Sequence, residues 1–83
     1  MFEEWVHRKV PRNVQERLEF AELLSLIRDK GMNNKEELVE FLEIQIEDSK
    51  RLFEEGGSAT RKRNFARRVD YFEKMLKMAK SYL

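Results

Sequence analysis

Few residues in this chain could perform acid–base or nucleophilic chemistry. The only imidazole is that of His7, and the chain contains no cysteine. A zinc site of the usual kind needs several nitrogen or sulfur ligands, and a serine becomes a nucleophile only beside a base. No base is suitably spaced from the four serines, which are Ser25, Ser49, Ser58 and Ser81. The sequence therefore predicts a protein that is not an enzyme, with no catalytic residue, metal, cofactor or small-molecule substrate.

A row of carboxylates at helical spacing is the next candidate for chemistry. It consists of Glu36, Glu40, Glu43 and Glu47. Di-iron bundles hold their metals with Glu-x-x-His motifs on paired helices, and the chain has no such motif. We therefore interpret this row as the solvated face of a helix.

Basic side chains gather between residues 61 and 68. They are Arg61, Lys62, Arg63, Arg67 and Arg68. Residues 56–83 hold eight basic and two acidic side chains, whereas residues 16–55 hold six basic and twelve acidic ones. The basic cluster could bind the phosphates of a nucleic acid. Alternatively, it could pair with Glu54 and Glu55 across the Gly56-Gly57 turn, because both groups lie at helix ends where the dipole disfavours their charge.

The helices that must position these residues follow from apolar side chains recurring every three or four positions. They are predicted over residues 14–30, 35–55 and 59–82. Asn13, Asn34 and Ser58 are the expected N-caps, and the first two begin capping boxes with Glu16 and Glu37.

Short links between these helices predict antiparallel neighbours. Gly31 suits the left-handed position after the first helix, and Gly56-Gly57 ends the second. We expect residues 2–10 to form a short N-terminal helix or arm before Pro11. The predicted fold is one all-α domain over residues 1–83, an antiparallel three-helix bundle with a short N-terminal helix or arm.

Two of the predicted helices carry more apolar surface than a single copy of the chain can bury. The helix over 14–30 is apolar on most sides, so we expect it at the centre or at a dimer interface. The helix over 59–82 has a regular seam from Phe65 to Leu83 and a second stripe beside it. Residues from both helices form the predicted surface for a partner or second copy: Leu23, Leu26, Tyr71, Met75, Met78 and Tyr82.

Composition and charge narrow the class of protein. Of the 83 residues, 41% are hydrophobic and 40% are charged, against about 25% charged in an average protein. No apolar run is long enough for a membrane span, and the acidic N-terminus is unlike a signal peptide. A cytoplasmic protein is therefore expected, and membrane binding is not.

These observations predict a non-enzymatic helical interaction module, a homo-oligomer or the ligand of a partner protein. The alternative is a small nucleic-acid-associated regulator that binds phosphates through residues 61–68. In that case the third helix must make the contact, because the acidic helix over 35–55 would be repelled by DNA.

Overall fold

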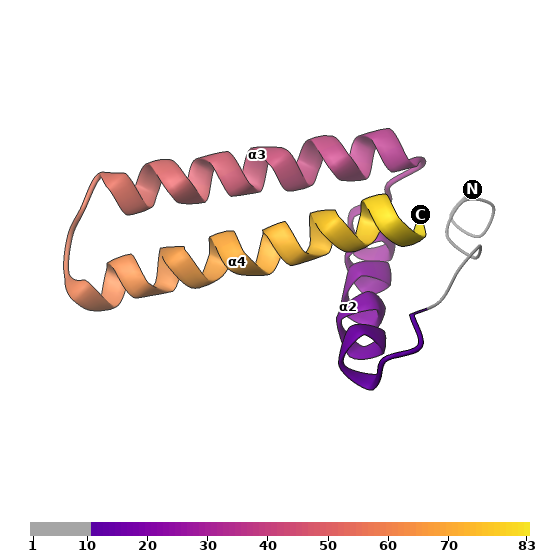
Figure 1. Ribbon diagram of the computed structural model, residues 1–83. Coiled ribbons are helices and arrows are strands. Elements are labelled where there is room, and N and C mark those ends of the chain that lie inside the picture. Colours follow the sequence, from indigo (N-terminus) through magenta and orange to yellow (C-terminus); the bar gives the residue numbers. More distant parts are fainter. Residues whose placement is uncertain (1–10) are drawn as a thin grey trace.

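The computed structural model describes residues 11–83, which contain three α-helices and no strand. The helices are α2 (Val14–Lys30), α3 (Lys35–Glu54) and α4 (Ala59–Tyr82) (Figure 1). The chain is therefore an all-α three-helix bundle over these residues. The predicted helix or arm over residues 2–10, including His7, lies outside the described residues.

Helix α2 begins and ends at the residues that its sequence marks. The Asn13 side chain accepts hydrogen bonds from the N–H groups of Gln15 and Glu16, at 2.8 and 3.3 Å. Gly31 ends the helix in the left-handed region, with φ 65°. The next residue, Met32, is buried, and its N–H donates to the Ile27 carbonyl at 3.1 Å. This Schellman-type ending turns the chain sharply before α3 begins.

The caps of α3 and α4 also lie where they were predicted. Asn34 Oδ1 accepts from the Glu37 N–H at 2.9 Å, and Ser58 Oγ accepts from the Arg61 N–H at 3.2 Å. The Glu37 carboxylate reaches back one residue further than a standard capping box, to the Asn33 N–H at 2.9 Å. Helix α3 ends at Glu54, with Glu55 as its C-cap.

The arrangement of the helices differs in one respect from the predicted one. Helices α3 and α4 form a long antiparallel hairpin, as expected, and α2 crosses its open end and packs against the last turns of α4 (Figure 1). The prediction that α2 and α3 would also be antiparallel neighbours is therefore wrong. The physical reason is the Gly31–Met32 ending, which redirects the chain across the hairpin instead of back along α2.

The buried residues divide the hairpin into two unequal parts. Every buried residue of α3 and α4 lies in residues 35–49 or 75–83, where α2 joins the hairpin. Between residues 50 and 74 no side chain is buried. We call residues 50–74 the tip, and residues 11–49 and 75–83 the base. The molecule is elongated, with extents of 43 × 26 × 19 Å.

Candidate interaction surfaces

Three of the six residues predicted to contact a partner instead form the core of the base. Leu23, Met75 and Met78 are buried, and they fill the space between α2 and α4. Leu23 belongs to α2 and the two methionines to α4, so these two helices cover each other's apolar side chains here. These three residues are therefore not available to a partner in the described structure.

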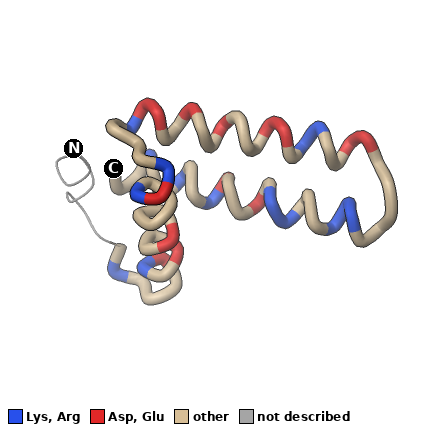
Figure 2. Tube along the Cα trace, turned by 180° about the vertical axis from the view of Figure 1, so that it is seen from behind, with Lys and Arg blue, Asp and Glu red and all other residues tan. Residues whose placement is uncertain are grey.

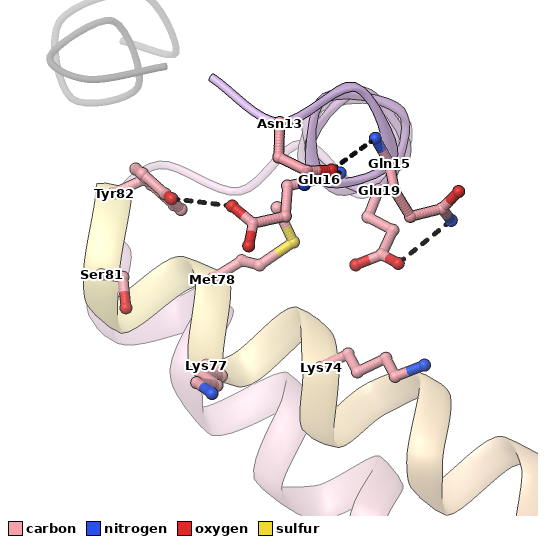
Figure 3. A pocket seen from close by; sticks show the side chains of 9 residues that line it. All are labelled: Asn13, Gln15, Glu16, Glu19, Lys74, Lys77, Met78, Ser81 and Tyr82. Atoms are coloured by element: carbon pink, nitrogen blue, oxygen red, sulfur yellow. Dashed lines mark hydrogen bonds between the residues drawn. The ribbon is translucent and has the colours of Figure 1, made fainter. Parts of the chain in front are cut away.

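Tyr82 fastens the end of α4 to the start of α2. Its ring packs edge-on against Phe20, with the centroids 5.8 Å apart. Its hydroxyl donates to Glu16 Oε2 at 2.9 Å, and this hydrogen bond, with smaller effects of burial and of the carboxylate charge, raises the pKa of Tyr82. Figure 3 shows Tyr82 reaching from α4 to Glu16, with Met78 pointing towards α2. Glu16 thus bonds Tyr82 and does not close the predicted capping box with Asn13.

The two remaining predicted partner residues are partly accessible. Leu26 is half-buried against the core. Tyr71 is 43% exposed and packs edge-on against Phe72, with the ring centroids 5.3 Å apart. Partial burial raises the pKa of Tyr71, and the nearby Glu22 carboxylate raises it further. Tyr71 therefore marks the place on α4 where the cover given by α2 ends.

The tip carries apolar side chains that no third helix among the described residues covers. Leu52, Phe65, Val69 and Phe72 are half-buried between α3 and α4, and Phe53 is exposed. A two-helix hairpin can shield only one side of such a seam. The predicted seam runs from Phe65 to Leu83, whereas the buried residues of α4, which are Met75, Met78 and Ala79, all lie in the last third of the helix.

The basic cluster lies at the start of α4, within the tip (Figure 2). The guanidinium groups of Arg61 and Arg68 lie over the Phe65 ring, at 5.3 and 5.8 Å from its centroid. These contacts fit cation–π attraction and restrict where the two charges can point. The remaining members, Lys62, Arg63 and Arg67, are exposed.

The predicted pairing of this cluster with Glu54 and Glu55 is not present. Within residues 11–83, the ion pairs around the hairpin are Lys50–Glu73 at 3.4 Å, Arg51–Asp48 at 3.3 Å and Lys74–Asp70 at 3.3 Å. None of them involves the five residues of the basic cluster. The positive charges at the start of α4 are therefore not neutralised by the acidic end of α3.

A further apolar surface was not singled out by sequence reasoning. Val14 and Leu18 are 73% and 60% exposed on the side of α2 opposite its buried residues, Phe20, Leu23 and Ile27. Exposed Ala21 continues the same stripe, because residues spaced four and three apart share a helix face. The feature of the sequence that could have identified this surface is the nearly uniform distribution of apolar residues around the helix.

The acidic face of α3 is exposed, with Glu36, Glu40, Glu43 and Glu47 surrounding Ile44. Among residues 11–83, no three carboxylate or histidine side chains converge closely enough to hold a metal ion.

The described residues thus define a helical hairpin whose open end is closed by a crossing helix. Comparison of the chain with protein families, with curated proteins and with solved structures finds no match in any of the three. None of the three described helices is long and apolar enough to cross a membrane.

Proposed function

We propose that this chain is a non-enzymatic helical interaction module that associates with a second copy of itself. The observation that supports this best is the tip, where no residue between 50 and 74 is buried although the seam is apolar. Contiguous exposed apolar surface is typical of sites that contact another macromolecule. Small elongated bundles also gain stability from pairing, because one copy buries little of its surface.

Sedimentation velocity over a concentration series tests this proposal. We expect the particle to change from one copy to two as the concentration rises through roughly tens of micromolar, which corresponds to an association free energy between about −4 and −8 kcal/mol. Phe65→Ser, in the tip, should weaken association. Ile44→Ser is the matched control, because Ile44 is 48% exposed on the acidic face of α3 and away from the tip. A wild-type particle that stays monomeric throughout would refute self-association.

A second candidate function is nucleic-acid binding by the basic cluster. It is favoured by five cationic side chains without an ion pair in the described residues, two of them held over Phe65. Fluorescence anisotropy with labelled DNA and RNA, starting near 50 mM salt, should show salt-dependent binding. Replacing Arg63 and Arg67 with Glu should weaken binding and flatten the salt dependence by about one unit per lost phosphate contact. Absence of binding at the lowest salt concentration would eliminate this candidate.

A further inference from the structure

Resting on the self-association proposed above, we infer that two copies pair antiparallel, with the tip of each seated on the outer face of the other's α2. The surface on α2 is the stripe of Val14, Leu18 and Ala21. The surface on the tip is the side of the hairpin that begins at Tyr71, where the chain's own α2 stops covering α4.

Within residues 11–83, no segment covers the apolar stripe on α2, where Val14 and Leu18 are 73% and 60% exposed. It lies opposite Phe20, Leu23 and Ile27, so it faces away from the hairpin that α2 covers. A helix with apolar residues on two opposite sides requires cover on both. A second hairpin placed on the outer side of α2 would supply the missing cover.

The tip has room for a helix on the same side of the hairpin as α2. Tyr71 and Arg67 line a hollow together with Gln15, Glu19 and Glu22 of α2. Beyond Tyr71, Asn64 lies two turns earlier on the same helix face, and no described segment crosses the hairpin there (Figure 1). In the first copy, α2 covers only the base of the hairpin. The α2 helix of a second copy would cover the tip in the same way.

The charge distribution selects the antiparallel orientation. The tip holds eight basic and four acidic side chains, a net charge of +4, and the base holds seven basic and ten acidic ones, a net charge of −3. A parallel pair would bring two positive tips together, whereas an antiparallel pair would place each tip beside the other copy's negative base. Since no ion pair within residues 11–83 involves the basic cluster, its charge remains available for this long-range attraction.

Two-fold symmetry makes each contact occur twice. In an isologous pair, the α2 of the first copy meets the tip of the second, and the reverse contact is identical. A substitution in the stripe therefore removes two contacts at once. If each Leu18→Ser loss raises Kd about tenfold, the dimer weakens about a hundredfold. Ile44→Ser should leave Kd unchanged.

The absence of cysteine in the chain allows a direct test by cross-linking. Two variants, Leu18→Cys and Asn64→Cys, are prepared separately and treated with a short bifunctional maleimide, alone and as an equimolar mixture. Both substituted side chains are exposed in the single chain. We expect covalent dimers in the mixture and little in either variant alone.

Each of the other possible results of this experiment would overturn a different part of the proposal. Efficient cross-linking of Asn64→Cys alone would show that tips meet tips and would overturn the antiparallel orientation. A wild-type dimer without mixed cross-links, and with Leu18→Ser unaffected, would overturn the contact surfaces while leaving self-association intact. A monomeric wild type would refute the proposed function itself. If the copies associate only when nucleic acid is added, the tip binds the phosphate backbone and not the α2 helix of a second copy.

Discussion

The uneven core predicts that two leucines on the same helix contribute very differently to stability. Leu42 is fully buried in the core of the base, whereas Leu52, ten residues later in the tip, is only half-buried. Both lie within α3, so replacement by Ala changes helix propensity equally at the two positions. The difference between Leu42→Ala and Leu52→Ala therefore reports packing alone.

The magnitudes follow from what each substitution removes. Leu42→Ala withdraws buried hydrocarbon at about 0.8 kcal/mol per CH₂ and leaves a cavity, for a loss of about 3 kcal/mol. Leu52→Ala removes half-exposed hydrocarbon and leaves no closed cavity, so the loss should be about 1 kcal/mol. A domain of this length has a total stability of only about 4–12 kcal/mol. Loss of the Leu42 side chain should accordingly lower Tm by more than about 10 °C.

Urea denaturation followed by far-UV circular dichroism measures both losses. It should be performed at a concentration at which the particle sediments as a monomer. Equal losses at the two positions would refute the division into a packed base and an open tip. If the tip is covered by a second copy, the cost of Leu52→Ala should grow as the concentration is raised, whereas the cost of Leu42→Ala should change less.

Three further predictions concern single contacts. Because the pKa of Tyr82 is raised in the folded chain, the stability from its bond to Glu16 is present below pH 10 and lost as pH rises through the folded pKa. Glu16→Gln should lower the pKa of Tyr82. An ultraviolet titration measures this in a Tyr71→Phe background, where Tyr82 is the only tyrosine left in the sequence. An unchanged pKa would disprove the contact between Tyr82 and Glu16. Gly31→Ala should lower the free energy of unfolding by about 1 kcal/mol. An added Cβ would meet nothing within 4 Å, so this cost comes from the backbone conformation, in which φ is 65°. Denaturant unfolding measures the loss, and a neutral result would exclude the left-handed turn. Glu43→Ala, on the exposed acidic face, should stay within about 0.5 kcal/mol of wild type by the same measurement, and a larger loss would mean that α3 is rotated.

Local signals in the sequence predicted the helices well. Asn13, Asn34 and Ser58 each accept a hydrogen bond from the first turn of the helix that they begin. Such caps involve residues two or three positions apart, so the sequence contains all the partners. The same holds for the Lys74–Asp70 ion pair, which joins residues four apart on one face of α4.

Contacts between distant residues were harder to predict. The pattern identified Leu23, Met75 and Met78 as apolar and facing a neighbour, but it could not say whether that neighbour was a helix of the same chain or of another copy. A short link limits the distance between two helix ends and leaves their crossing direction open. That direction depends on the left-handed Gly31 and the buried Met32, whose combined effect is visible only in three dimensions.

The basic cluster illustrates a charge arrangement that local rules explain only in part. Arg61, Lys62 and Arg63 stand in or near the first turn of α4, where the helix dipole disfavours cations by about 0.3–1 kcal/mol each. Pairing with Glu54 and Glu55 would have offset this cost, but two guanidinium groups lie over Phe65 and no such ion pair forms.

The uncompensated charge and the uncovered apolar seam are therefore at the same end of the molecule. An approaching surface that is apolar and part of an acidic body would relieve both costs together. The base of a second copy has both properties, since its α2 presents Val14 and Leu18 within a net negative region. A polyanion would relieve only the charge and leave the seam exposed, so raising the salt concentration separates the two cases. Salt should abolish nucleic-acid binding but only weaken a dimer that also buries apolar surface.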